Sequence, residues 1–97
     1  MLIYIIMLED YSNPKLVYKK ARDMFGPDVI IQPSTRKSKK YMILKPNGRW
    51  VHFGQYGMED YTKHKNLMRR EAFRTRNRKW AYSSILSPAF LSFWLLW

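Results

Sequence analysis

The chain has 97 residues, which is the length of one small domain. It carries a formal net charge of +11, and 16% of its residues are aromatic, more than one small core is expected to hide. It has no cysteine, which excludes disulfides, thiolate chemistry and cysteine-ligated zinc.

Charge is distributed unevenly along the chain. Residues 1–32 carry equal numbers of bases and acids, 33–55 carry six bases and no acid, 56–80 carry eight bases and three acids, and 81–97 carry no charged side chain. A positive field attracts phosphate or acidic protein surfaces. We therefore expect a single small domain, 1–97, with a neutral βαβ-like part (1–32), a basic hairpin–helix module (33–80) and an apolar docking tail (81–97).

The neutral part begins with Leu2 to Leu8, a β-branched and aromatic run that predicts a buried strand. Asn13-Pro14 then places a capping residue before a proline, which predicts a helix start, and Gly26-Pro27 ends that helix. A second strand is expected at 28–32. The apolar face of the helix is expected to comprise Val17, Ala21, Met24 and Phe25.

A basic loop, 33–40, precedes a hairpin centred on Asn47-Gly48, the strongest short hairpin signal. A two-residue loop would pair Leu44 with Val51 and Met42 with Phe53, and we expect these four side chains to face the core. The opposite face would carry Ile43, Lys45, Trp50 and His52. Because that face mixes aromatic and basic residues, we expect a partner to cover part of it.

A basic helix is expected from Tyr61 to Trp80, with Asp60 or Thr62 as its cap. Its cations lie all around the helix axis, and like charges four residues apart repel. This pattern predicts anionic neighbours on more than one side. The cations are Arg69, Arg70, Arg74, Arg76, Arg78 and Lys79.

The tail contains Ser87-Pro88, which predicts a cap and the first position of a short helix. The residues that follow are apolar all round, so the tail is expected to dock in its own core, in a partner, or in both. Neither terminal apolar run has the features of a signal peptide or the roughly 20 apolar residues of a bilayer span. The expected fold class is α+β: a small N-terminal βαβ-like unit, a β-hairpin, a basic helix and a short apolar C-terminal helix.

Catalytic and metal-binding alternatives rest on few residues. His52 and His64 lack a metal-ligand spacing, although Glu59 and Asp60 lie near them in the sequence. The ordinary interpretation is one hydrogen-bonded strand histidine and one solvated histidine. The glycines of "GQYG" predict a bend after the hairpin rather than a phosphate cradle. No nucleophile or nucleotide-binding motif is found, so we expect no enzyme activity, no metal and no cofactor.

Four stretches of the chain resemble a known family: "PSTRKSKKYMI", "WVHFGQYGMEDYTKHK", "RR" and "LSPAFLSFWLLW". They are similar to small basic proteins and repeated modules of nucleocytoplasmic large DNA viruses. The resemblance covers about residues 33–97 and departs at Asn66, where aspartate is expected. The family has no established activity, and the resemblance implies a virion component, such as a minor capsid protein.

The leading hypothesis is therefore a minor capsid protein of a large double-stranded DNA virus. It would be located in the virion capsid, and in the host cytoplasm during assembly. Its expected partners are other virion proteins, with nucleic acid or another anionic surface as the alternative. The expected partner-binding residues are Arg69, Arg70, Arg74, Arg76, Arg78, Lys79, Trp50, Trp80, Phe90, Trp94 and Trp97.

Overall fold

The protein has an α+β fold, and its computed structural model describes residues 8–97. Three antiparallel strands form a sheet in the order β1–β2–β3. The strands are β1 (Ile31–Pro33), β2 (Lys39–Leu44) and β3 (Trp50–Gln55). The helical elements are α2 (Pro14–Phe25), α3 (Tyr61–His64), α4 (Leu67–Arg76), the 3₁₀ turn η1 (Arg78–Tyr82), α5 (Pro88–Leu91) and the π-helical turn η2 (Ser92–Leu96).

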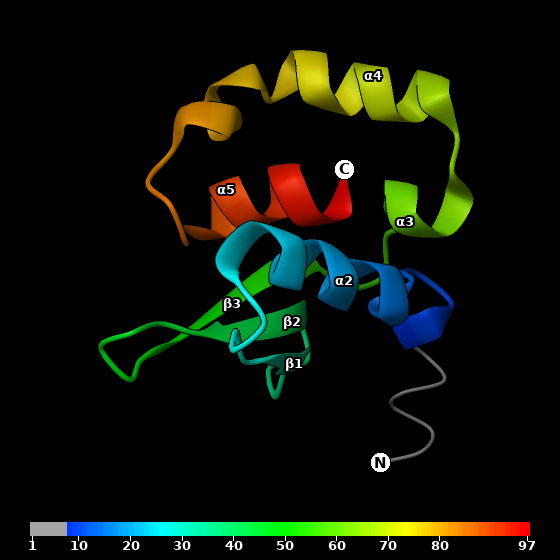
Figure 1. The fold of residues 1–97 in the computed structure, drawn as a ribbon. Coiled ribbons are helices and arrows are strands. Elements are labelled where there is room, and N and C mark those ends of the chain that lie inside the picture. Colours follow the sequence, from blue (N-terminus) through cyan, green and yellow to red (C-terminus); the bar gives the residue numbers. More distant parts are fainter. Residues whose placement is uncertain (1–7) are drawn as a thin grey trace.

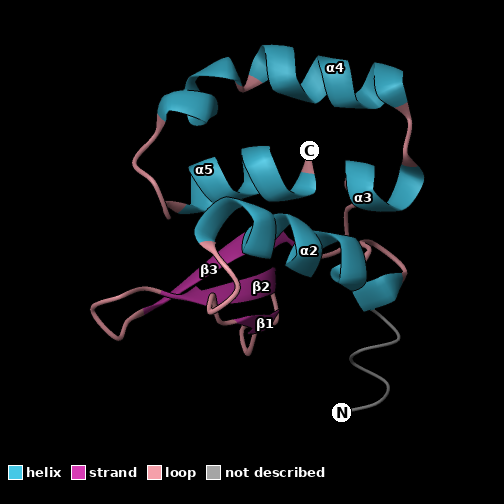
Figure 2. Cartoon of the chain, viewed as in Figure 1, coloured by secondary structure: helices cyan, strands magenta, loops and turns pink. Residues whose placement is uncertain are grey.

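The elements are arranged in layers (Figure 1). We refer to α5 and η2 together as the C-terminal helix, because they run on without a break. This helix and α2 lie between the sheet and α4, and α4 is the element farthest from the sheet (Figure 2). The core draws side chains from all parts of the chain. Its fully buried members are Leu8, Val17, Ala21, Tyr41, Ile43, Phe53, Leu91, Leu95 and Leu96.

The predicted N-terminal helix is confirmed by α2 and its caps. The Asn13 Oδ1 accepts a hydrogen bond from the Leu16 N–H at 3.2 Å, and Gly26 follows the last turn with φ +99°. Val17 and Ala21 are buried as expected, but Met24 is 42% exposed. The predicted strand from Leu2 to Leu8 lies outside the described residues except for Leu8, which is in a helical turn.

The second predicted strand, 28–32, is observed later in the chain, as β1. It ends at Pro33 and pairs antiparallel with β2, with Ile31 opposite Ile43. Proline is tolerated there because β1 lies at an edge of the sheet, where one side of the strand needs no N–H donor. Within residues 8–97 the sheet therefore contains no parallel βαβ pairing.

The hairpin is confirmed, but its predicted register is wrong by one residue on β2. The Lys45 N–H donates to the Arg49 oxygen at 2.8 Å, so the loop has three residues, and Gly48 takes φ +84°. Phe53 is consequently opposite Tyr41 rather than Met42. A shift of one residue reverses the faces of a strand, so Tyr41 and Ile43 face the core.

The single basic helix predicted from Tyr61 to Trp80 is divided into α3, α4 and η1. Lys65 adopts φ +54°, which ends α3, and the Asn66 Oδ1 then accepts from the Arg69 N–H at 3.1 Å to cap α4. Asn66 is the position where the resemblance led us to expect aspartate. Asparagine and aspartate are equally good caps, so this departure leaves the helix start intact.

The tail docks in the core of its own chain. The Ser87 Oγ accepts from the Phe90 N–H at 3.2 Å, so the predicted cap is present. Leu91, Leu95 and Leu96 are buried among the core residues of α2 and the sheet. Nothing in the described part of the chain forms a helix with the length and apolar character that a bilayer crossing requires.

Gly54 lies where β3 approaches the C-terminal helix. Its φ is +81°, and a Cβ placed on it would lie 2.8 Å from the Leu96 Cδ1 and 3.2 Å from the Lys40 Cβ. Gly57 has a similar φ of +97°, but a Cβ there would meet no atom within 4 Å. The two glycines therefore share the backbone requirement, and only Gly54 has the steric one.

This pair separates backbone strain from close packing. Gly57→Ala is expected to lower the free energy of unfolding by about 1 kcal/mol, the cost of a positive φ for alanine. Gly54→Ala is expected to lower it by about 2–4 kcal/mol, because overpacking is added to the strain. Urea unfolding followed by circular dichroism measures both, and equal losses would contradict close packing at Gly54.

Candidate functional site

The basic helix α4 presents three differently used faces and has no fully buried residue. Arg70 and Arg74 turn towards the C-terminal helix. Arg69 and Arg76 line a cavity between α4 and the sheet. Met68, at 84% exposure, points to solvent. The arginines that surround the helix axis in the sequence are thus divided among separate environments.

Arg70 and Arg74 hold the end of the C-terminal helix. The Arg70 Nε donates to the main-chain oxygen of Trp97 at 2.8 Å, and the Arg74 Nη1 reaches the same oxygen at 3.5 Å. The Arg74 guanidinium also lies 4.5 Å from the ring centroid of Phe93 and 5.3 Å from that of Trp94. Cations at a helix C-terminus complement its partial negative charge. Part of the anionic environment expected for these arginines therefore comes from the chain itself.

A third cation, Lys20 of α2, joins this group. Its Nζ lies 3.5 Å from the Leu95 main-chain oxygen. Burial lowers the pKa of Lys20 from its usual value, and the positive charge of Arg70 lowers it further. The last turn of the C-terminal helix is therefore fixed by cations from two other helices.

An aromatic cluster connects α4 to the last residue. The rings of Phe73 and Trp97 are stacked with centroids 4.3 Å apart and an interplanar angle of 7°. Trp80 packs edge-on against Phe73 at 5.7 Å, and the His64 ring lies 5.2 Å from Trp97. Since α4 has no fully buried side chain, these ring contacts and the two arginines account for much of its attachment.

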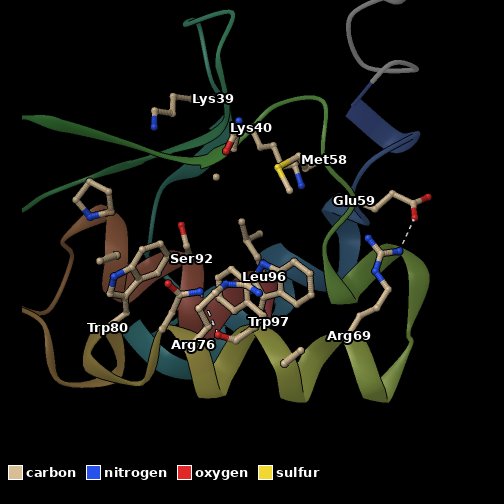
Figure 3. Close-up of a pocket in the computed structure, with 17 residues that line it drawn as sticks. Lys39, Lys40, Met58, Glu59, Arg69, Arg76, Trp80, Ser92, Leu96 and Trp97 are labelled. Atoms are coloured by element: carbon tan, nitrogen blue, oxygen red, sulfur yellow. Dashed lines mark hydrogen bonds and ion pairs between the residues drawn. The ribbon is translucent and has the colours of Figure 1, made fainter.

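A groove lies beneath α4, and several of the predicted site residues line it. It has a volume of about 720 Å³. Figure 3 shows its wall on one side formed by α4 and η1 and on the other by the sheet, with the ion pair between Arg69 and Glu59 at one end and Trp80 towards the other. Its lining includes Lys39, Arg69, Phe73, Arg76, Trp80, Ala89, Ser92 and Trp97.

The cations of the groove differ in their pairing. Arg69 forms an ion pair with Glu59 at 3.3 Å, and Lys40 forms one with Asp60 at 3.0 Å. Lys39 and Arg76 form no ion pair with any other residue in 8–97. The groove therefore offers two uncompensated positive charges to a ligand.

A buried polar network lies behind the groove. Lys40, predicted to be in a basic loop, is instead on β2 with its side chain 2% exposed, and its Nζ donates to the Asp60 carboxylate and to the Tyr11 main-chain oxygen. The Thr62 hydroxyl donates its proton to the same carboxylate, and its oxygen accepts a hydrogen bond from the Asn13 N–H. Burial lowers the pKa of Lys40, while the Asp60 charge opposes this shift.

The network extends from Thr62 through Ser12 to Tyr41 in the core, and each hydrogen bond along it is donated towards Asp60. Tyr41 donates through its hydroxyl to the Ser12 Oγ at 2.6 Å, which leaves the Ser12 proton for the Thr62 Oγ1 at 3.2 Å. Donors from Tyr41 and from Lys40 therefore both lead to the Asp60 carboxylate. Sequence reasoning missed this network. Neighbouring acids and bases in a charged stretch look solvated, and no residue pattern marks their burial.

The other predicted partner-binding residues lie at or near the surface. Arg78 and Lys79 are exposed on η1, and Trp80 and Trp94 are each 36% exposed. The Trp94 Nε1 donates to the Ala81 oxygen at 3.3 Å, and the Phe90 and Trp94 ring centroids are 6.2 Å apart. These residues are thus gathered where η1 meets the C-terminal helix. Trp50, 39% exposed on β3, is not among the residues that line the groove.

The two histidines have different environments. The His52 Nδ1 is 2.6 Å from the Ser34 Oγ, which confirms the expected hydrogen-bonded strand histidine. His64 was expected to be solvated, and this is wrong: it is half-buried, and its Nδ1 accepts from the Asn66 N–H at 2.9 Å. Within residues 8–97, no three His, Asp or Glu side chains are grouped so as to hold a metal ion.

Comparison with known proteins places the chain in a family. The model of a family of unknown function, DUF5754, matches residues 29–77, just over half of the chain. The chain belongs to this family. The matched segment contains the sheet, α3 and α4, and with them Lys40, Gly54 and Asp60, whereas α2 and the C-terminal helix lie outside it. No curated protein and no solved structure matches the chain.

The buried pair predicts a strong coupling. Lys40→Met is expected to lower the free energy of unfolding by about 3–5 kcal/mol, because the Asp60 charge stays buried without its partner. Lys40→Met combined with Asp60→Asn is expected to be less destabilised than Lys40→Met alone, since the introduced amide is uncharged and can still accept from Thr62.

The control is the exposed pair of Lys19 and Asp23, whose atoms are 2.7 Å apart on α2. The equivalent double substitution there is expected to show a coupling below about 0.5 kcal/mol. Chemical unfolding of all single and double variants measures both couplings. Additive losses at Lys40 and Asp60 would show that the buried pair does not act as a unit.

The histidines predict a loss of stability in acid. Burial lowers the pKa of His64 below 6.5, with the Arg69 charge acting in the same direction, and burial lowers the pKa of His52 as well. As the pH falls below 6.5, the histidines of the unfolded chain bind protons before those of the folded chain do. The free energy of unfolding therefore decreases as the pH is lowered through this range. We expect His64→Gln to reduce the difference between urea midpoints at about pH 7.5 and about pH 5. His52→Gln is the matched comparison, and an unchanged difference in both variants would contradict the prediction.

Proposed function

We propose that the protein is a structural component of a large double-stranded DNA virus particle, a minor capsid protein that bridges neighbouring subunits. The observation that carries the proposal is a surface where η1 meets the C-terminal helix. We call it the basic–aromatic surface, and it comprises Arg78, Lys79, Trp80, Tyr82 and Trp94. Tyr82 is 86% exposed, and Trp80 and Trp94 are each 36% exposed.

The composition of this surface is typical of a binding interface. Aromatic residues and arginine are enriched in protein–protein interfaces, and tryptophan, tyrosine and arginine dominate their binding energy. Contacts within the chain also fix the surface, because the Trp94 indole N–H is hydrogen-bonded to the Ala81 oxygen and Trp80 packs on Phe73. A preorganised surface loses little side-chain freedom when a partner binds.

The tail contributes to this function chiefly by supporting the surface. Leu91, Phe93, Leu95 and Leu96 are buried in the chain's own core. Of the partner-binding residues predicted in the tail, Phe90, Trp94 and Trp97 are not fully buried, and Trp97 is already stacked on Phe73. The proposal therefore assigns the bridging contacts mainly to η1 and its surroundings, with Trp50 on the hairpin as a separate contact.

The location proposed is the capsid of the particle, reached from the host cytoplasm during assembly, with other virion proteins as partners. The similarity of the four stretches to virion-associated proteins supports this assignment. The role is binding rather than catalysis, and it uses no cofactor.

Nucleic-acid binding is the second candidate, and the net charge of +11 favours it. Arginines beside exposed tryptophans can bind phosphates and stack on bases. However, Arg70 and Arg74 contact their own chain, which leaves fewer cations for a phosphate backbone.

Fractionation of purified particles tests the proposal. We expect the protein to stay with the capsid shell after nuclease digestion and washing in salt on the order of 0.5 M, because desolvated interface contacts are weakly screened. Mass spectrometry of the shell and of the released material measures its distribution. Its absence from particles would contradict the proposal.

Release by nuclease or moderate salt would instead support the nucleic-acid candidate. A DNA titration provides an independent check, because each phosphate contact on duplex DNA contributes about 0.9 to the slope of log affinity against log salt.

A further inference from the structure

We infer that the groove beneath α4 is a docking site for an acidic peptide segment with an apolar side chain, supplied by a neighbouring protein. This inference rests on the proposed function, since it names the kind of partner that such a bridging protein would bind. The groove is separate from the basic–aromatic surface except at Trp80, which belongs to both.

Charge on the two walls points to an acidic ligand. Lys39 approaches the groove from β2, and Arg76 approaches it from α4 (Figure 3). Neither is paired with an acidic residue in the described part of the chain, whereas Arg69 is paired with Glu59. A ligand that places one carboxylate near each of Lys39 and Arg76 would compensate both charges.

The floor and one wall of the groove point to an apolar side chain in the ligand. The C-terminal helix contributes Ala89 and Ser92, whose small side chains leave the space open. Phe73, Trp80 and Trp97 provide aromatic surface beside them. A volume of about 720 Å³ falls within the range of ordinary ligand sites. An aromatic or leucine side chain would bury its surface against these rings.

One feature favours a peptide over a nucleic-acid strand. The two uncompensated cations lie on opposite walls and do not form a row along one side, whereas a nucleic-acid groove tracks a continuous backbone with positive charge. A peptide carries its acids on side chains that can diverge to both walls.

Contacts within the chain hold the side chains that line the groove. The stack of Phe73 on Trp97 and the ion pair of Arg69 with Glu59 fix side chains on its wall and at its end. Binding therefore requires little rearrangement, which favours measurable affinity for a short segment.

Fluorescence anisotropy with the 97-residue chain tests the inference. The probe is a fluorescein-labelled hexapeptide of sequence Glu-Asp-Phe-Leu-Asp-Glu, compared with its lysine-substituted counterpart and a labelled thymidine hexanucleotide. We expect the acidic peptide to bind and the other two to bind at least about tenfold more weakly. Equal or tighter binding of the oligonucleotide would overturn the inference in favour of a nucleic-acid site, and no binding of the acidic peptide would overturn it outright.

Charge reversals locate the binding. Arg76→Glu and Lys39→Glu are each expected to weaken the peptide by about tenfold or more. Arg49→Glu makes the same change in net charge at an exposed position of the hairpin, outside both the groove lining and the basic–aromatic surface, and is expected to weaken it less than about threefold. Equal effects of Arg76→Glu and Arg49→Glu would show attraction by overall charge and overturn the inference.

A steric variant tests the apolar part of the site. Ala89→Leu fills the floor without changing charge and is expected to abolish binding of the phenylalanine-containing peptide. Thermal unfolding of each variant verifies folding. If Ala89→Leu is unfolded, the comparison of the exposed variants Arg76→Glu and Arg49→Glu still decides the question.

The peptide-binding experiment and the particle fractionation test different claims, so a negative result in one does not decide the other. A protein found in the shell that does not bind the acidic peptide retains its proposed location and loses the docking site. Specific peptide binding by a protein absent from particles retains the docking site and removes the virion role.

Discussion

The attachment of α4 depends on its contacts with Trp97. The ring of Trp97 is stacked on Phe73, and its main-chain oxygen accepts a hydrogen bond from Arg70. The helix α4 has no fully buried residue, so its own composition does not attach it to the core. The C-terminal helix does have a buried apolar face, and Trp97 at its end contacts α4. The groove and the basic–aromatic surface both exist because this helix lies between α4 and the sheet (Figure 1).

A second constraint fixes the direction from which α4 starts. The Asp60 carboxylate receives donors from Lys40 on β2 and from Thr62 on α3, and the network reaches Ser12 before α2. Three segments far apart in the sequence are thereby joined at the base of α3. Lys65 and Asn66 then redirect the chain into α4. Buried ion pairs often contribute little net stability, and here the pair chiefly specifies how these segments meet.

Sequence reasoning succeeded where the signal is local. Asn13-Pro14 and Ser87-Pro88 start helices as predicted, because a cap and a proline act through neighbouring backbone groups. It failed where the signal is tertiary or depends on one residue. Asn47-Gly48 fits both two-residue and three-residue loops, so it did not determine the hairpin register. Lys40 was assigned to a solvated loop because its partner, Asp60, is 20 residues away in the sequence. The different environments of the α4 arginines depend on where the tail packs, and residue spacing in the sequence does not predict that position.

In the proposed binding role, the charges of Arg70 and Arg74 would affect how fast a partner arrives more than how long it stays, because both side chains contact their own chain. Arg74 lies against the rings of Phe93 and Trp94 and forms no ion pair with an acidic side chain in the described residues, so its charge still adds to the field around the molecule. Long-range steering responds to the sum of charges, whereas dissociation responds to the contacts that must be broken. In the proposed binding role, this charge would speed encounter with an acidic partner, and the residence time would depend on the smaller group of side chains that contact it.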